Sequence, residues 1–300
     1  MSVFIGADAG GTKTAVIVAD GDRELARATG GAGAVRAGRA LQAASRIAAA
    51  VRGALTSAGL LQGDVLVVGA AGVGRDPERS ELREALRTER VAEKIVVTGD
   101  LDLALEAAFA TGPGIVLVAG TGSVAVGRTP DGVIHRRGGL GWQVGDEGSA
   151  YAIARAALAA VGVAQDGRGP ATSLLRGMGV LARVNGFDEL LRWSTAAQPA
   201  EVAALAPAVF EAAAAGDAVA GAIAAGAVDD LVALAAALVP AFGKQLPIAT
   251  ALAGGLLSPG RPLHNPLLAR LRKDKHFAPD GRAIDPAQGA VALARRALGA

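Results

Sequence analysis

The residues with the clearest capacity for chemistry lie within the first fourteen positions. An apolar run, Val3–Ala7, leads into an acidic residue, two glycines and then a Thr-Lys-Thr sequence. Glycines let backbone N–H groups approach an anion closely, hydroxyls and a lysine donate hydrogen bonds to it, and a carboxylate can hold Mg²⁺ directly or through water. These residue types in this order suit a polyphosphate with its metal. The expected contacts are Asp8 for the metal and, for the phosphates, Gly10, Gly11, Thr12, Lys13 and Thr14.

Two other interpretations of this segment stand beside the phosphate site. A P-loop places its lysine directly after a glycine and opens a helix, whereas Lys13 follows Thr12 and the next residues, Ala15–Ala19, are strand-like. The pattern therefore predicts a strand–turn–strand hairpin. A glycine-rich hairpin turn without any ligand is the plainer alternative, because such turns commonly join two strands.

Composition bounds the class of protein. The chain has 300 residues, of which 51% are apolar, so it can bury the core of one large or two medium domains. It has no cysteine, which excludes disulfides, thiolate zinc sites, iron–sulfur clusters and a cysteine nucleophile. A formal charge of +2 and an aromatic content of 3% give no support for nucleic-acid binding. The first strand begins at once without a signal sequence, and Leu231–Phe242 is too short to span a bilayer, so we expect a cytoplasmic protein with no membrane partner.

Strands and helices alternate along the first hundred residues, which indicates an α/β sheet with an antiparallel start. The expected strands are 3–7, 15–19, 25–28, 65–69 and 94–98, and the expected helices are 38–58, 77–87 and 101–109. A second cycle opens after Gly112, with strands at 115–119, 124–127 and 133–137, so two related lobes are expected. Residues 149–242 read as mostly helical, followed by a strand at 248–253 and helices at 266–272 and 286–298.

A second glycine turn follows the apolar strand that opens the second cycle. It offers backbone N–H groups and two hydroxyls, as the first turn does. The segment also satisfies a loose dinucleotide-binding pattern, but that pattern requires a helix next, and Val124–Gly127 is strand-like. We therefore expect a second phosphate-binding hairpin, with contacts at Gly120, Thr121, Gly122 and Ser123.

Three further segments carry candidate site residues. Asp100 ends one strand and begins a helix, at the edge where ligands of α/β sheets collect, so it is a candidate catalytic carboxylate. Capping of the helix explains this residue equally.

A glycine-framed loop at 138–149 holds Gly141, Trp142 and the acidic pair Asp146 and Glu147. Carboxylates accept several hydrogen bonds from sugar hydroxyls and a Trp supplies an apolar wall, although helix capping also explains the acidic pair. Gly254 and Gly255 follow another strand and would let a flat base lie against the backbone.

Taken in order, these motifs resemble those of the actin-like ATPase and sugar-kinase superfamily. The resemblance is closest to its N-acetylglucosamine kinase branch, which also contains the activating ATPases of 2-hydroxyacyl-CoA dehydratases and benzoyl-CoA reductases. The residues that carry it are Asp8–Thr14, Thr98–Asp100, Ala119–Ser123, Gly145–Ser149 and Gly254–Gly255. The resemblance implies an α/β fold of two ribonuclease-H-like lobes around an interlobe cleft that takes ATP and Mg²⁺. The implied lobes are 1–112, completed by the C-terminal helix 286–300, and 113–285.

The resemblance also implies a role for each matched segment. The two glycine turns clamp the phosphates of ATP, and Gly254 and Gly255 lie near the adenosine. Asp100 is the general base that takes the proton from a sugar hydroxyl, while Asp146 and, less directly, Glu147 hold the sugar. This agrees with phosphoryl transfer in general, where the protein mainly positions groups and neutralises charge. Family likeness further implies a homodimer.

The missing cysteine separates the branches of the superfamily. The activating ATPases hold an iron–sulfur cluster through cysteine, and repressor-type sugar kinases often carry a cysteine-rich zinc motif, so both are excluded.

The expected activity is phosphorylation of an amino sugar, at the 6-hydroxyl of N-acetylglucosamine, with glucosamine or N-acetylmuramic acid as alternative acceptors. Relatives often carry an Asn after the third strand, but Gly30–Arg36 has none, which leaves recognition of the N-acetyl group open. Arg36 would suit a more anionic acceptor or is simply a solvated charge. A nucleotide-dependent binding or regulatory module is the alternative of a different class.

Overall fold

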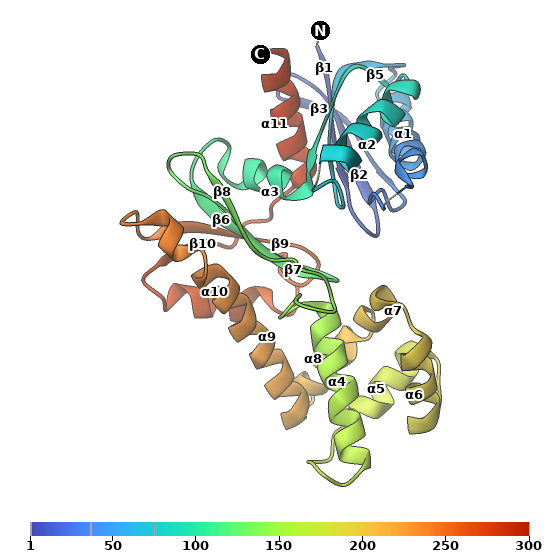
Figure 1. Cartoon of the computed structure of the whole chain (residues 1–300), viewed down its shortest axis with the longest axis vertical. Coiled ribbons are helices and arrows are strands. Elements are labelled where there is room, and N and C mark those ends of the chain that lie inside the picture. Colours follow the sequence, from blue (N-terminus) through green and yellow to red (C-terminus); the bar gives the residue numbers. More distant parts are fainter. Residues whose placement is uncertain (1, 37, 75, 300) are drawn as a thin grey trace. The chain divides into compact units, whose positions relative to one another are not determined.

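The computed structural model describes residues 2–36, 38–74 and 76–299. The chain divides into two compact units (Figure 1), of which unit 1 comprises Met1–Gly112 with Ile284–Ala300 and unit 2 comprises Pro113–Ala283. Each unit is built on one five-stranded sheet. Because the second unit interrupts the first in the sequence, the last helix of the chain, Pro286–Leu298, belongs to the same unit as the first strand, Val3–Ala9.

Unit 1 begins with an antiparallel meander, and two parallel strands extend it on the other side of β1. The strands are β1 (Val3–Ala9), β2 (Thr14–Asp20), β3 (Arg23–Gly30), β4 (Gly63–Ala70) and β5 (Ala92–Gly99), in the spatial order β3-β2-β1-β4-β5. The helices are α1 (Ala40–Ser57), α2 (Asp76–Thr88), α3 (Asp100–Phe109) and α11 (Pro286–Leu298). β1 is central and buried from both sides, which explains its continuous apolar sequence.

The two faces of this sheet are covered by different helices. Side chains alternate along β1, so Ile5 packs with α1 and α2, whereas Phe4 packs with α3 and α11. Gly6 lies on the same face as Phe4, and a Cβ there would come within 2.4 Å of the Ala287 carbonyl oxygen. Glycine at this position therefore lets α11 lie directly on the strand.

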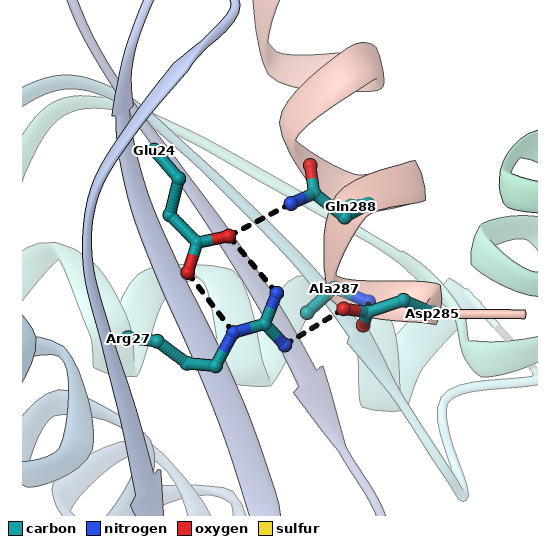
Figure 2. A network of polar contacts seen from close by, with 5 residues as sticks. All are labelled: Glu24, Arg27, Asp285, Ala287 and Gln288. Carbon is teal, nitrogen blue, oxygen red and sulfur yellow. Dashed lines mark hydrogen bonds and ion pairs between the residues drawn. The ribbon is translucent and has the colours of Figure 1, made fainter.

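Ion pairs fix α11 at both of its ends. Near its C-terminus, Arg296 donates two hydrogen bonds to the carboxylate of Glu106 on α3, whose side chain is only 2% exposed. At its N-terminus, Asp285 caps the helix by accepting the N–H of Ala287 (3.1 Å). Figure 2 shows how Arg27 on β3 bridges Asp285 (2.7 Å) to Glu24 (2.9 Å). The N-terminus of α11 is thus attached to the edge of the sheet.

Unit 2 repeats the sheet of unit 1. Its strands are β6 (Gly114–Ala119), β7 (Ser123–Arg128), β8 (Ile134–Gly138), β9 (Ile248–Ala253) and β10 (Phe277–Asp280), in the order β10-β9-β6-β7-β8. Again a meander of three strands is followed by two strands parallel to the first. The same order and directions in both units confirm the predicted α/β fold of two ribonuclease-H-like lobes.

Helices form the remainder of unit 2 around a single apolar core. They are α4 (Ala150–Gln165), α5 (Leu174–Ala182), α6 (Gly186–Ala196), α7 (Pro199–Ala203), α8 (Ala206–Ala214), α9 (Ala218–Ala236), the 3₁₀ turn η1 (Val239–Phe242) and α10 (His264–Arg272). Within the described residues, one helical stretch, Ala218–Phe242, is long and apolar enough to cross a membrane. In this structure α9 packs against α4, α8 and α10 and contributes Ala220, Ala227 and Leu231 to the core.

Most predicted elements are present with ends shifted by a few residues. The sequence analysis missed β10, which pairs with β9 over four residues at the edge of the sheet and contains Pro279. A short run with a proline is weak evidence for a strand, and only its partner makes it one. The start of α3 also differs, because the helix begins at Asp100 and not after it.

Candidate active site

The first predicted phosphate turn is the tip of the β1–β2 hairpin. Asp8 and Ala9 are the last paired positions of β1, and Thr14 begins β2 opposite Ala9. The N–H of Gly10 donates to the Lys13 carbonyl (2.9 Å), which closes the turn. Gly11, Thr12 and Lys13 are exposed at its tip. The turn therefore presents backbone, a hydroxyl and an ammonium to solvent, as a phosphate site requires.

Thr14 has a different environment from the rest of the turn. Its side chain is fully buried, and its hydroxyl donates to the Gly31 carbonyl (2.8 Å). A hydroxyl has one hydrogen to donate, and in this structure that of Thr14 is used within the protein. Thr14 thus ties the hairpin to the segment after β3, where Gly33 and Ala34 also donate to the Gly10 carbonyl (both 3.1 Å), and its place in the phosphate site stays a prediction.

The surroundings of Asp8 disfavour the ionised form of its carboxylate. It shares the face of β1 that carries Phe4 and Gly6, and so points to the side of α3 and α11. Burial and, to a smaller extent, the negative charges of Asp100 and Asp285 together raise its pKa to about 6, although the charge of Lys13 acts in the opposite direction. The charges of Asp100 at the start of α3 and of Asp285 at the start of α11 therefore act on Asp8.

This arrangement suits a cation supplied together with a ligand. No group of three or more metal-binding side chains occurs among residues 2–36, 38–74 and 76–299. Asp8 fits Mg²⁺ as a single hard oxygen ligand whose buried charge lacks compensation, and the phosphates and water would complete the six ligands. Sequence reasoning missed Asp285: its Asp-Pro pair signals a helix start, but only the fold brings it near Asp8.

Asp100 is the first residue of α3, directly after β5. The cap of this helix is formed by Asp102, whose carboxylate accepts the N–H of Gly99 (3.1 Å) and the hydroxyl of Thr98. The Asp100 carboxylate accepts the N–H of its neighbour Leu101 (3.0 Å). Both carboxylates thus accept N–H groups at the start of α3, so a structural role for Asp100 at this helix end stands beside the catalytic one.

The second phosphate turn joins β6 to β7 in unit 2. Gly120 donates its N–H to the Gly122 carbonyl (2.9 Å), and its own carbonyl accepts the N–H of Ala150 at the start of α4 (2.9 Å). Thr121 is exposed at the tip. Ser123 is buried, and its hydroxyl donates to the Glu147 carbonyl (2.6 Å). The Ser123 hydroxyl is thus used within the protein, as that of Thr14 is, and its place in the phosphate site likewise stays a prediction.

The acidic loop is bound to this second turn. Asp146 has a positive φ of 63° and is 9% exposed, and its carboxylate accepts the N–H of Ser123 (3.3 Å). Burial raises the pKa of Asp146, the Ser123 N–H lowers it, and the charge of Glu147 raises it. A Cβ on Gly122 would lie 2.8 Å from the Asp146 carboxylate, so a side chain there would displace that carboxylate. Glu147 itself is exposed.

The rest of the loop is shaped by glycine and closed by a serine cap. Gly141 has a φ of 91°, and its carbonyl accepts the N–H groups of Val144 (3.1 Å) and Gly145 (2.8 Å). Trp142 is 44% exposed and contacts the ring of Tyr151 at 5.4 Å between centroids. Ser149, not Asp146, caps α4 by accepting the N–H of Ala152 (3.1 Å). The acidic pair is therefore not explained by capping.

The third glycine segment lies beside the second turn. Gly254 has a φ of 96°, and a Cβ on it would come within 2.3 Å of the Ala119 carbonyl oxygen, the residue before the turn. The backbone nitrogen of Gly255 lies 3.8 Å from the position that a Cβ on Gly120 would take. Unit 2 therefore brings together three of the predicted segments: the Gly120–Ser123 turn, the Gly254–Gly255 pair and the acidic loop.

Comparisons with known proteins agree with these motifs. A model of the BadF/BadG/BcrA/BcrD ATPase family matches residues 5–294. The N-acetyl-D-glucosamine kinase of Dictyostelium discoideum is 29% identical over 231 residues, which is 72% of each chain. The N-acetylmuramic acid/N-acetylglucosamine kinase of Clostridium acetobutylicum is 36% identical over 109 residues, so the match spans about a third of each chain. A crystal structure from Chromobacterium violaceum, whose name assigns it provisionally as an N-acetylglucosamine kinase, has a TM-score of 0.82 and 30% identity and covers 98% of this chain and 99% of its own.

Proposed function

The chain belongs to the BadF/BadG/BcrA/BcrD ATPase family and is an ATP-dependent kinase, and we propose that its acceptor is an amino sugar, phosphorylated at the 6-hydroxyl of N-acetylglucosamine. The observation that best supports this is the combination, within unit 1, of the exposed hairpin tip with two carboxylates, Asp8 on β1 and Asp100 directly after β5, which act on each other electrostatically although β4 lies between the two strands. One carboxylate serves the metal of the nucleotide and the other serves the acceptor.

Each unit offers a turn suited to the phosphates of a nucleotide. In unit 1 the Gly10–Lys13 turn donates hydrogen bonds to the phosphates, and Asp8 holds the Mg²⁺ that accompanies ATP. This Mg²⁺ neutralises charge on the phosphates during transfer. In unit 2 the N–H groups of Gly120–Gly122 and the hydroxyl of Thr121 are the phosphate donors, and Gly254 and Gly255 are the pair suited to the adenosine.

The acceptor is oriented by carboxylates. Asp100 accepts a hydrogen bond from the reacting hydroxyl, aligns its oxygen with the γ-phosphorus and takes its proton as the new P–O bond forms and the bond to ADP breaks. Asp146 and Glu147 accept hydrogen bonds from other hydroxyls of the sugar, and Gly141 and Trp142 border it. Negative carboxylates suit this task because sugar hydroxyls can all act as donors.

Two other amino sugars are alternative acceptors for the same phosphorylation reaction. Glucosamine carries an ammonium that an acidic loop would favour. N-acetylmuramic acid carries a carboxylate, and the exposed Arg36 lies next to Val35, whose N–H donates to the Ala71 carbonyl (2.8 Å). The name of the Clostridium relative includes this sugar. A regulatory module that binds ATP without phosphorylating a sugar is the alternative of a different class.

The test is ADP release measured against a panel of these three sugars, with and without Mg²⁺. We expect release that requires both Mg²⁺ and an amino sugar. Asp100→Asn should lower turnover by about 10²–10⁴-fold while ATP binding persists. Asp76→Asn is the matched control, because Asp76 also begins a helix but its side chain is 95% exposed. ADP release that no sugar stimulates would reject the kinase in favour of the regulatory module.

Two properties of the molecule in the cell accompany this proposal. We infer a cytoplasmic enzyme, since its substrates, ATP and a free amino sugar, occur there. We also infer a homodimer, which light scattering coupled to size exclusion tests directly: a mass of one chain in solution would contradict it.

A further inference from the structure

Unit 2 contains a cavity that is lined by none of the motifs of the candidate active site. Its volume is about 720 Å³, and it lies along α5 and the turn that follows this helix, Arg183–Gly186. Figure 1 shows α5 and the adjacent α6 at the end of unit 2 that lies away from its sheet. The volume is in the range of pockets that bind small molecules.

One face of α5 forms a wall of this cavity. The lining residues within the helix are Leu175, Arg176, Gly179 and Val180, at the spacing that places side chains on the same face. The carbonyl of Gly179 accepts the N–H of Val184 (2.9 Å), and a Cβ on Gly179 would lie 3.0 Å from the Val184 carbonyl oxygen. The glycine therefore lets the turn after α5 come back close to the helix, beside the cavity.

Two arginines give this cavity its charge. Arg176 and Arg183 both line it, seven positions apart, which is roughly 10 Å along a helix axis. Both residues are exposed, and neither forms an ion pair within the part of the chain that the structure describes. A guanidinium is always charged and matches a phosphate with two parallel hydrogen bonds. The cavity therefore favours an anionic ligand.

Two carboxylates close to the cavity are engaged by other groups. Asp217 accepts the hydroxyls of Thr172 and Ser173 (both 2.8 Å), which are themselves lining residues. Glu189 accepts the backbone N–H of Asn185 (2.7 Å) in the turn after α5. Each carboxylate thus stabilises the start of a helix, α9 for Asp217 and α6 for Glu189, and pairs with neither arginine.

The backbone at Arg183 gives a second indication that its guanidinium is used. Arg183 directly follows the last residue of α5 and has a left-handed conformation, with a φ of 57° and a ψ of 46°. Glycine usually takes this position after a helix, because a Cβ is strained there. The same turn does use glycine at its other left-handed residue, Gly186 (φ 76°). A long cationic side chain kept at a strained position indicates a functional constraint.

We propose that this cavity binds a small phosphate monoester, such as a sugar phosphate, whose phosphate accepts hydrogen bonds from Arg176 and Arg183. The rest of the lining suits the body of such a molecule. Leu175 and Val180 offer apolar contact to a sugar ring. The side-chain amide of Asn185, which makes no hydrogen bond to the described residues, both donates to and accepts from hydroxyls. The site is separate from the candidate active site and does not rest on the proposed function.

The test follows the backbone amides of Gly179, Asn185 and Gly186 by NMR during titration with three probes. The probes are inorganic phosphate, N-acetylglucosamine 6-phosphate and unphosphorylated N-acetylglucosamine. Because these amides belong to residues that line the cavity, phosphate bound at the glycine turns of the candidate active site is observed separately. We expect saturable shifts with both phosphates, at lower concentration for the sugar phosphate, and none with the unphosphorylated sugar.

Variants of the two arginines test which groups bind the phosphate. Arg176→Ala and Arg183→Gly should each raise the dissociation constant obtained from these shifts about tenfold or more, since each removes charge-assisted hydrogen bonds. Arg192→Ala is the matched control and should stay within twofold, because Arg192 is an exposed arginine of α6 that does not line the cavity. Arg183→Gly also removes backbone strain, so its melting temperature should not fall below that of the wild type.

Three outcomes would overturn the proposal. The first is that neither phosphate shifts these amides. The second is an equal shift with the unphosphorylated sugar, which would show that the cavity does not recognise phosphate. The third is a dissociation constant that the arginine variants leave unchanged, or that Arg192→Ala raises equally, since either result would separate binding from Arg176 and Arg183.

Discussion

Replacement of Asp8 by Asn should stabilise the protein while destroying its affinity for the nucleotide. The pKa of Asp8 is raised from the ordinary 3.8 to about 6 in the folded chain. The folded state therefore binds a proton that the unfolded state has released, and the stability contributed at this residue falls as pH rises from about 4 to 6. The shift of about 2 units, at 1.36 kcal/mol each, corresponds to ~3 kcal/mol lost above pH 6.

Asn has the shape of protonated Asp but cannot ionise, so Asp8→Asn should avoid this loss. We expect the variant to be more stable than the wild type by about 3 kcal/mol at pH 8, and equal to it near pH 4. For a unit of this size ~3 kcal/mol corresponds to a rise of roughly 6–12 °C in the melting temperature. Thermal unfolding followed by circular dichroism between pH 4 and pH 8 measures this, with Asp76→Asn as a control whose melting temperature should follow the wild type.

Mg²⁺ and ATP should reverse the order of stability. The wild type, whose Asp8 charge is compensated by the metal, should gain melting temperature with the ligand, because a ligand that binds only the folded state stabilises it. Asp8→Asn should gain much less. A variant that is less stable than the wild type at pH 8, or a difference between them that does not change with pH, would refute the reasoning.

Three other predictions follow from single contacts. Arg296→Ala should lower the free energy of unfolding, measured by urea titration, by about 3 kcal/mol, because it leaves the buried carboxylate of Glu106 without its partner. The control Arg295→Ala breaks an exposed ion pair and should lower it by less than about 1 kcal/mol. Equal losses in the two variants would contradict this reasoning. Ser123→Ala should raise the KM for the sugar more than the KM for ATP in steady-state assays, because its hydroxyl supports the acidic loop; a change in the KM for ATP alone would return this residue to the phosphate site. The dissociation constant of Mg²⁺ and ATP, measured by calorimetry, should rise about tenfold for each pH unit below about 6, where Asp8 becomes protonated; a constant that does not change between pH 5 and 8 would show that the ionised Asp8 is not required.

Much of the fold follows from local pattern. The apolar runs of β1 and β6 are each followed by a glycine turn and another strand, so both hairpins and the repetition of the lobe could be predicted from residues adjacent in the chain. β10 could not, since four residues that include a proline become a strand only by pairing with β9. The return of the chain to unit 1 after the whole of Pro113–Ala283 is likewise not a local property, although Gly6 and Asp285 are suited to receive α11.

The types of site residues were determined by the sequence, but their assignments were decided by the tertiary structure. Residue type shows that Thr14 and Ser123 can donate a hydrogen bond, but not that the Gly31 and Glu147 carbonyls receive it. Likewise only the structure shows that Asp102 accepts the N–H of Gly99 while Asp100 accepts that of Leu101. The physical reason is that a hydroxyl or carboxylate has few hydrogen-bonding positions, and only the fold decides which neighbours occupy them.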